Sequence, residues 1–451
     1  MSDKAEQGQL RVGLCGLGTV GGGTLRLLQQ KKDEISRRLG RELTVVHIAT
    51  RTRKDDEFDL SGIRFSDDVF AVADDPEVDI LIELIGGFDP ALDLVMRAIE
   101  NGKHVVTANK ALIALHGNEI FEAARHKGVT VAYESAVAGG IPIIKALREG
   151  LAANSIQWLA GIINGTGNYI LTEMGERERE FPEVLQEAQS LGYAEADPTF
   201  DVEGIDAAHK LAILAANAFG VELQFERVYT EGISQITPED IAYAEELGYK
   251  VKHLGISRIT EKGIEMRVHP TLISQQTLLA NVNGVMNAVW VKGDSAGSTL
   301  YYGAGAGAEA TASSVVADLF DIARGEIMAS DKSRQALVPP LAFSELRRDV
   351  PVLDIEDIES EYYLRIPAYD KVGVMARISQ VLEQYGVNIE AVIQKEPHGE
   401  DAERGIVPVV LLTSRVREGQ MNVAIGVIEQ LDQVAGKLMR IRVEQFDGEE
   451  H

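Results

Sequence analysis

Short apolar runs alternate with longer segments of helical character across residues 1–150, and this alternation restricts the fold more than any other feature. The runs span residues 10–14, 43–49, 78–84, 104–107 and 129–134. Glycines such as Gly102 and Gly128 end the helical segments. Strands and helices at this pitch predict an α/β fold with a Rossmann-type, doubly wound parallel sheet. In such sheets, ligands bind beyond the carboxyl ends of the strands.

A glycine turn follows the first run and opens the first predicted helix. Gly16, Gly18 and Gly21 form the pattern GxGxxG. The first glycine permits a tight turn, the second admits a pyrophosphate and the third allows close helix packing. The positive N-terminus of the helix would favour the pyrophosphate charge. We interpret the turn as a dinucleotide site; a glycine-rich turn without a ligand is the alternative.

Basic residues follow the second run, where an NAD-specific site usually has an acid that binds the ribose 2′-hydroxyl. Arg51 and Arg53 occupy this region instead. A guanidinium binds a 2′-phosphate through two parallel hydrogen bonds, whereas a carboxylate repels it. The pattern favours NADP(H) over NAD(H); two solvated surface charges are the alternative interpretation.

Later strand ends bring more polar residues to the same predicted edge of the sheet. Gly87, Lys110 and Glu134 each lie at the end of an apolar run or just after it. Lys110 is therefore expected near the nicotinamide end of the cofactor. A solvated lysine at the start of a helix would explain Lys110 equally simply.

Acidic residues gather in the stretch 194–211, which leads into a mostly apolar helix. The acids are Glu195, Asp197, Asp201, Glu203 and Asp206, and one lysine, Lys210, follows them. Asp206 and Lys210 lie four residues apart, so they share one face of a helix. The stretch would suit a substrate with an ammonium group and a proton donor. A solvated acidic loop with one surface ion pair is the alternative.

The remaining chain predicts three further parts. The dinucleotide-binding domain is expected to span residues 1–150 and to be completed by residues 304–330. The first further part is an α+β substrate-binding and oligomerisation domain over residues 151–303. Residues 331–360 include a proline- and acid-rich run and predict a linker. Residues 361–451 show the strand and helix order of a ferredoxin-like βαββαβ domain.

Composition restricts the partners and the compartment. The net charge of −26 argues against nucleic acid and anionic membranes, because both would repel such a surface. The single cysteine, Cys15, excludes an intramolecular disulfide and fits a reducing compartment. The N-terminal residues do not resemble a secretory signal, and no apolar run reaches the roughly 18 residues of a membrane span. We therefore expect a cytoplasmic protein.

Five separated motifs together resemble homoserine dehydrogenases of the monofunctional type, which carry a C-terminal ACT domain. The motifs begin at Glu83, Thr107, Asn164, Ala194 and Tyr302, and their order is that of the family over nearly the whole chain. The resemblance implies reduction of L-aspartate 4-semialdehyde to L-homoserine with NAD(P)H, in threonine, methionine and isoleucine biosynthesis. It also implies a dimer or tetramer and feedback inhibition by threonine, with Asn388 near the threonine site.

Residue roles follow from the same resemblance. It implies Lys210 as the general acid/base with Lys110 and Asp206 beside it, and Glu195, Asp201 and Asp206 as substrate contacts. Together with the turn and strand-end analysis, the expected cofactor residues are Gly16, Gly18, Thr19, Val20, Arg51, Arg53, Gly87, Lys110 and Gly303, the last in a loop that closes on the nicotinamide. A monovalent cation, usually sodium, is implied at Glu134, Val137, Gly139 and Ile141, held mostly by backbone oxygens.

Two other functions compete with this interpretation. Aspartate-semialdehyde dehydrogenase uses a similar cofactor fold but needs a cysteine nucleophile beside a base. Cys15 is the only cysteine and lies in the glycine turn, so this function is excluded. A non-catalytic sensor of nucleotides and amino acids, built from the same domains, stays open at this point.

Overall fold

The computed structural model describes residues 9–52, 57–328, 338–396 and 403–446. These residues form two compact units. The first unit comprises residues 1–165, 206–228 and 286–350, and the second comprises residues 166–205, 229–285 and 351–451. The predicted division into four parts follows sequence patterns rather than contacts, and it stays a prediction.

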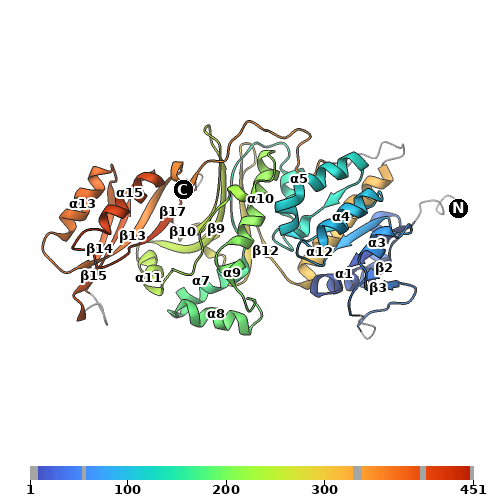
Figure 1. Cartoon of the computed structure of the whole chain (residues 1–451), viewed down its shortest axis with the longest axis horizontal. Coiled ribbons are helices and arrows are strands. Elements are labelled where there is room, and N and C mark those ends of the chain that lie inside the picture. The colour runs from blue at the N-terminus through green and yellow to red at the C-terminus, as the bar shows by residue number, and fades with distance from the viewer. Residues whose placement is uncertain (1–8, 53–56, 329–337, 397–402, 447–451) are drawn as a thin grey trace. The chain divides into compact units, whose positions relative to one another are not determined.

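A parallel sheet with the strand order β3-β2-β1-β4-β5-β6 forms the N-terminal part of the first unit (Figure 1). Its strands are β1 (Leu10–Cys15), β2 (Leu43–Ala49), β3 (Arg64–Ser66), β4 (Ile80–Glu83), β5 (His104–Thr107) and β6 (Val131–Ala132). The strand order reverses direction between β1 and β4, which is where a doubly wound sheet binds its ligand. The predicted Rossmann-type fold is confirmed. Strand β3 was not predicted, because three residues carry almost no periodic signal.

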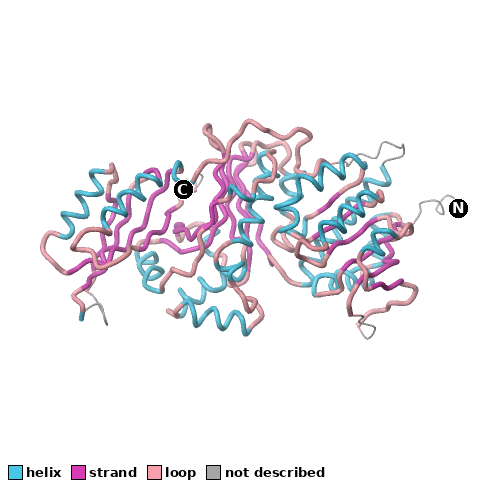
Figure 2. Tube along the Cα trace, viewed as in Figure 1, coloured by secondary structure: helices cyan, strands magenta, loops and turns pink. Residues whose placement is uncertain are grey.

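Helices pack against this sheet in two groups, and Figure 2 shows strands and helices layered in this part of the chain. Contacts join α1 to α2 and α12, and join α4 to both α3 and α5. The helices of the first unit are α1 (Thr19–Gln30), α2 (Lys32–Leu39), α3 (Phe70–Asp74), α4 (Ala91–Glu100), α5 (Lys110–Lys127), α6 (Ile143–Lys145), α10 (Ile205–Phe219) and α12 (Ala308–Met328). Short turns of 3-10 or π type are η1 (Glu134–Ala136), η2 (Ala146–Gly150) and η3 (Phe225–Arg227).

An antiparallel ladder completes the first unit. Strand β11 (Met286–Gly293) lies between β7 (Ile156–Ile162) and β12 (Gly297–Ala304). The chain leaves β12 through a glycine-rich turn and enters α12. This order places Gly303 at the end of a strand, just before the helix that packs on α1.

The second unit contains a mixed sheet with the order β9-β10-β17-β13-β15-β14. Its strands, with β8 and β16 paired beside them, are β8 (Tyr229–Thr230), β9 (Tyr249–Ile259), β10 (Ile264–Ser274), β13 (Glu359–Tyr369), β14 (Ile389–Gln394), β15 (Ile406–Thr413), β16 (Val416–Arg417) and β17 (Met439–Val443). Strands β13, β14, β15 and β17 with helices α13 and α15 form the predicted ferredoxin-like fold. Strand β17 pairs with β10, so the sheet continues from the C-terminal domain into the strands before it.

Helices and short turns complete the second unit. They are α7 (Gly165–Arg177), α8 (Phe181–Ser190), α9 (Thr199–Val202), α11 (Pro238–Glu246), α13 (Val374–Gln384), α15 (Glu418–Ile428), η4 (Leu279–Asn281) and η5 (Ile355–Asp357). Residues 165–168 form the first turn of α7. Two glycines there lower helix propensity, but the following apolar residues Ile170, Leu171 and Met174 are buried and hold the helix.

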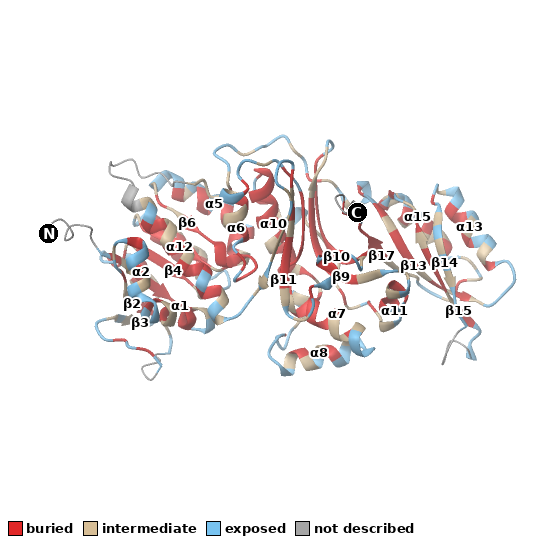
Figure 3. Cartoon of the chain, turned by 180° about the vertical axis from the view of Figure 1, so that it is seen from behind, coloured by how far each residue is buried: buried red, intermediate tan, exposed pale blue. Residues whose placement is uncertain are grey.

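Buried apolar side chains form a separate core in each part of the sheets. Figure 3 shows the strands largely in the colour of buried residues. One core lies around β1, β2 and β4, a second around α7 and β9, and a third around β13 and α13. Among the described residues, no helix has both the length and the apolar character that a bilayer crossing requires.

Candidate active site

Asp206, in the first turn of α10, forms the centre of a charged cluster in the first unit. Its Oδ2 accepts hydrogen bonds from Lys210 Nζ at 2.7 Å and from Asn164 Nδ2 at 2.8 Å. Its Oδ1 lies 3.1 Å from Lys110 Nζ. Lys210 Nζ also donates to the Ile163 carbonyl oxygen at 2.7 Å. The predicted i,i+4 pair therefore exists, and Lys110 joins it from the N-terminus of α5, just after β5.

Burial distinguishes this cluster from a surface ion pair. The side chains of Asp206 and Lys210 are 5% and 12% exposed, so the solvated-loop interpretation does not describe these two residues. Burial disfavours the charged carboxylate of Asp206. The ammonium groups of Lys210 and Lys110, with the hydrogen bond from Asn164, outweigh this effect and lower the pKa of Asp206 to about 2. Asp206 is thus ionised at every pH at which the protein would work.

Hydrogen bonds at the ends of β4 and β5 position Lys110. Glu83, fully buried at the end of β4, accepts from the backbone N–H groups of Ile85 and Gly86 and from Thr107 Oγ1. Thr107 Oγ1 in turn accepts from the N–H of Asn109 at 3.0 Å. This chain of hydrogen bonds fixes the turn from which α5 starts.

Asn109 then caps α5 and ties it to the neighbouring turn. Its Oδ1 accepts from the N–H of Leu112 at 3.1 Å, and its Nδ2 donates to the carbonyl oxygen of Gly87 at 2.6 Å. Lys110 is the first residue of the capped helix. Neither Glu83 nor Asn109 was predicted from the sequence to have a role. The signal was an acid at the end of a fully apolar strand, because buried acids need partners.

His209 is buried and packs as a structural side chain. Its ring stacks on Phe225, with the ring centroids 4.2 Å apart. Burial lowers the pKa of His209 to about 4, so the ring is neutral near pH 7. His209 is next to Lys210 in the sequence, but its neutral ring adds no charge to the cluster of Asp206, Lys110 and Lys210.

The glycine turn after β1 has the geometry that a pyrophosphate needs. Gly16 has a φ of +98°, and a Cβ there would lie 2.6 Å from the carbonyl oxygen of Leu84. A Cβ on Gly21 would overlap the carbonyl oxygen of Gly16. A Cβ on Gly18, in contrast, would meet nothing within 4 Å. The first and third glycines are thus required by packing, whereas the second faces open space at the N-terminus of α1.

The first turn of α1 is open in the same direction. No side chain caps its N-terminus, and Thr19 is exposed while Val20 is half-buried. The first backbone N–H groups of a helix lack partners within the helix and suit an anion. The residues present therefore fit a dinucleotide.

Arg51 lies two residues beyond the end of β2, and its side chain is exposed. This position matches the one expected for a residue that contacts the cofactor ribose. Arg53, which was expected beside it, lies outside the described residues. Of the two arginines expected to bind a 2′-phosphate, Arg51 is the one that lies within the described residues.

The loop of the expected cation site is buried, and the Glu134 carboxylate in it already accepts hydrogen bonds from backbone N–H groups. The carboxylate of Glu134 accepts from the N–H groups of Ile144 and Lys145, at 2.9 and 2.8 Å. A cation here would have to be held by backbone carbonyl oxygens, as expected. Ala138 and Gly139 both have positive φ, and the carbonyl oxygen of Gly139 accepts from Ser314 Oγ at 2.7 Å. Among the described residues, no cluster of three or more His, Cys, Asp or Glu side chains could hold a metal ion.

The glycine-rich turn after β12 lies against this loop. A Cβ on Gly139 would lie 2.5 Å from the carbonyl oxygen of Gly305, and one on Gly303 would lie 3.2 Å from Ile141 Cγ1. The Gly140 N–H donates to the carbonyl oxygen of Ala304 at 3.0 Å. The expected cation loop and the expected nicotinamide loop are therefore neighbours in the first unit.

Glu195 and Asp201, expected as substrate contacts, lie in the second unit on the segment before α10. Glu195 is exposed, and Asp201 is half-buried in α9. Two other acids of this stretch accept hydrogen bonds within the second unit. Asp197 Oδ1 accepts from the N–H of Thr199 at 3.1 Å, and Glu203 Oε1 accepts from Ser234 Oγ at 3.0 Å.

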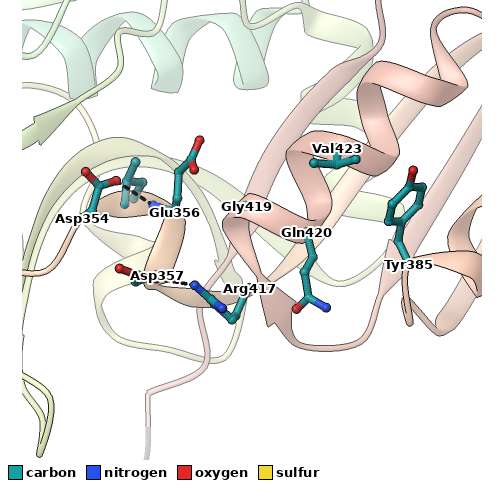
Figure 4. A pocket seen from close by; sticks show the side chains of 9 residues that line it. Asp354, Glu356, Asp357, Tyr385, Arg417, Gly419, Gln420 and Val423 are labelled. Carbon is teal, nitrogen blue, oxygen red and sulfur yellow. Dashed lines mark hydrogen bonds and ion pairs between the residues drawn. The ribbon is translucent and has the colours of Figure 1, made fainter.

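A pocket of about 770 Å³ lies in the ACT-like part of the second unit (Figure 4). It lies between η5 and the N-terminal turns of α15, with Tyr385 at one side, and Asp357 pairs with Arg417 at its wall. Asn388, expected near a regulatory ligand, is exposed but does not line this pocket. Its backbone N–H donates to Ser414 Oγ, and its carbonyl oxygen accepts from the N–H of Ser414.

Cys15 is a poor nucleophile in this environment. It is fully buried in the last position of β1, and burial raises the pKa of its thiol far above the ordinary value. The exclusion of a cysteine-dependent aldehyde dehydrogenase therefore stands on geometry as well as on sequence.

Three segments of the chain match protein-family models. Residues 16–134 match the family model described as "Homoserine dehydrogenase, NAD binding domain", and residues 142–320 match "Homoserine dehydrogenase". Residues 362–422 match "ACT domain".

Individual relatives agree with these matches. The homoserine dehydrogenase of Pseudomonas aeruginosa is 60% identical over 97% of this chain and 99% of its own length. The crystal structure of a homoserine dehydrogenase from Thiobacillus denitrificans is similar with a TM-score of 0.90 and 57% identity, covering 97% of this chain and 99% of that one. A hyperthermophilic archaeal homoserine dehydrogenase in complex with NADPH has a TM-score of 0.60 and 26% identity, covering 75% of this chain and all of its own.

Proposed function

Because the chain belongs to the homoserine dehydrogenase family of oxidoreductases and carries an ACT regulatory domain, we propose that it reduces L-aspartate 4-semialdehyde to L-homoserine with NADPH as the preferred donor. The observation that carries the proposal is the buried contact of Asp206 with Lys110 and Lys210. Family membership sets aside the non-catalytic sensor. The pathway role in threonine, methionine and isoleucine synthesis and the cytoplasmic location are parts of the same proposal.

The cofactor is held by the turn after β1 and by the basic residues after β2. The open N-terminus of α1, at Gly18, Thr19 and Val20, binds the pyrophosphate, and Arg51 binds the 2′-phosphate. Arg53 is proposed to assist Arg51. Gly87 and Gly303 border the nicotinamide end. The NADPH bound by the archaeal relative supports this choice of donor.

The chain's own residues then bind the substrate and move one proton. When bound, NADPH supplies a hydride to the aldehyde carbon. Lys210 donates a proton to the aldehyde oxygen as negative charge develops there, and the Asp206 carboxylate orients the side-chain amino groups of Lys210 and Lys110. Glu195 and Asp201 bind the ammonium group. A sodium ion on the backbone oxygens of Glu134, Val137, Gly139 and Ile141 would stabilise the buried loop.

Lys210→Ala tests the catalytic assignment. The variant should lower kcat for homoserine oxidation with NADP⁺ by about 10²–10⁴-fold, because the proton carrier is lost. Binding of NADPH, followed by its fluorescence, should survive. Lys127→Ala, at the exposed end of α5, is the matched control and should behave as wild type. A kcat near the wild-type value in Lys210→Ala would refute the role of Lys210.

Threonine inhibition tests the regulatory part of the proposal. Threonine should lower the initial rate of homoserine oxidation, and Asn388→Ala should weaken that inhibition while the uninhibited rate stays unchanged. Arg417→Ala, at the wall of the pocket in Figure 4, tests that pocket as a second candidate place for threonine and should leave the inhibition unchanged if threonine binds near Asn388. Equal threonine sensitivity in wild type and Asn388→Ala would remove Asn388 from the proposal. Sedimentation of the same samples would distinguish a dimer from a tetramer.

A further inference from the structure

Arg442, on β17, is buried and binds carboxylates from two different segments. Its Nε lies 2.9 Å from Glu418 Oε2, and its Nη1 lies 2.8 Å from Glu231 Oε2. Arg440 on the same strand reaches the same two carboxylates, at 2.7 and 3.4 Å. Tyr229 Oη donates to Glu231 Oε2 at 2.9 Å. Glu231 is thus held by the last strand of the ACT-like domain. Strands β10 and β17 run side by side in the second unit (Figure 1).

Glu231 begins a short segment, residues 231–234, that packs against the acidic stretch at residues 202 and 203. The Glu231 N–H donates to the carbonyl oxygen of Val268 in β10 at 2.8 Å. Next along the chain, a Cβ on Gly232 would lie 2.7 Å from the carbonyl oxygen of Val202. The Ile233 N–H donates to the same oxygen at 2.9 Å. The segment 231–234 therefore packs directly on residues 202 and 203.

The supported residues lie between two proposed substrate contacts. Val202 immediately follows Asp201, and Gly204 precedes Ile205 and Asp206. Gly204 has a φ of +81°, and a Cβ there would lie 3.0–3.1 Å from His253, Thr230 and Val268. The backbone between Asp201 and Asp206 thus packs against β10 and against the segment 231–234.

We propose that Arg442 is a positioning residue for substrate binding: by holding Glu231, it fixes the segment on which the Asp201–Asp206 loop rests. The inference rests on the proposed function, in which Asp201 and Asp206 contact the substrate. It assigns to the C-terminal domain a part in positioning Asp201, which lies in the same unit. Without Arg442, the Glu231 carboxylate keeps, among the described residues, only the longer 3.4 Å contact with Arg440 and the hydrogen bond from Tyr229, so the segment 231–234 is held less firmly.

Steady-state kinetics of homoserine oxidation test this inference. Arg442→Met should raise KM for homoserine about tenfold, because small displacements of binding groups weaken substrate binding, with kcat and the Kd of NADPH nearly unchanged. Glu231→Gln removes one charge and leaves Glu418 paired, so it should fold even where Arg442→Met does not, and it should raise KM in the same way. Arg442→Lys keeps a cation and should recover part of the lost affinity.

Arg365→Met is the matched control, because Arg365 forms a comparably buried ion pair with Asp240 elsewhere in the second unit. An equal rise in KM in this control would show general loosening and overturn the proposal. Asp201→Asn distinguishes a failure of the proposed substrate contact from a failure of the positioning role of Arg442. A normal KM in Asp201→Asn would refute the proposed substrate contact. A raised KM in Asp201→Asn with normal values in folded Glu231→Gln and Arg442→Met would refute the positioning role alone.

Discussion

Asp206 shows how one buried carboxylate organises residues from distant parts of a chain. At an effective dielectric constant near 20, unit charges about 3 Å apart attract by about 5 kcal/mol. Asp206 has two such partners, Lys110 and Lys210, and burial makes each pair sensitive to removal of the carboxylate. The carboxylate therefore keeps two ammonium groups close together that would otherwise repel each other.

Arg51 carries a residue-scale prediction on cofactor choice. Arg51→Glu should raise KM for NADP⁺ by about 10–100-fold, because a charge-assisted hydrogen bond is lost and a repulsive charge is added. KM for NAD⁺ should change little. Arg125→Glu, an exposed residue near the end of α5, controls for the change in net charge. An unchanged ratio of the two KM values in Arg51→Glu would contradict the NADP preference.

At the scale of the element, the turn between β1 and α1 assigns different tasks to its glycines. Gly16 and Gly21 meet neighbouring backbone, whereas Gly18 faces open space. The sequence pattern does not distinguish a glycine required for packing from one that faces a ligand. An added methyl group should lower stability at the first kind and weaken cofactor binding at the second.

Gly18→Ala should change stability by less than about 1 kcal/mol, because the new Cβ meets no neighbour and only the N-cap preference is altered. It should nevertheless weaken NADPH binding, since the methyl group occupies the path of the pyrophosphate. Gly21→Ala should instead lower the free energy of unfolding by about 1–3 kcal/mol, through overlap with the Gly16 carbonyl. Urea unfolding and NADPH titration of both variants check this, and the same pattern in both would refute the distinction.

At the scale of the whole molecule, buried titratable groups give opposing pH dependences. Burial lowers the pKa of His209 and of His253 to about 4, and it raises the pKa of Glu134 to about 7. A neutral buried histidine contributes stability above its unfolded pKa of about 6.5, and that stability is lost as the pH falls toward 4. Glu134 acts in the opposite sense, because its contribution is lost as the pH rises from about 4.5 to 7. Wild-type stability alone therefore cannot isolate one group.

His253→Gln isolates the contribution of His253. The histidine Nε2 donates to the Glu231 carbonyl oxygen at 2.9 Å, and glutamine offers a donor that does not titrate. Between pH 7 and pH 4, wild type should lose up to about 3 kcal/mol relative to the variant, since each unit of pKa difference is worth about 1.36 kcal/mol. Urea unfolding at several pH values measures this difference. A constant difference across the range would show that His253 titrates normally.

Much of the fold was predictable because its signals are local. Strands β1, β2, β4 and β5 were apparent from apolar runs, and the C-terminal βαββαβ order from strand and helix periods. The short strand β3 was not predicted, since its conformation depends on the tertiary contacts of neighbouring residues. The roles of Glu83 and Asn109 were missed for the same reason.

The sequence by itself determined the sheet alternation, the glycine turn and the pairing of Asp206 with Lys210, because spacing within one element decides which side chains share a face. Only the tertiary structure decided that Lys110 joins Asp206, that Gly18 faces open space and that Arg442 reaches Glu231. Contacts between distant segments depend on how whole elements pack, and burial is a property of that packing. Burial is also what converts an ordinary surface pair into a charged cluster suited to catalysis.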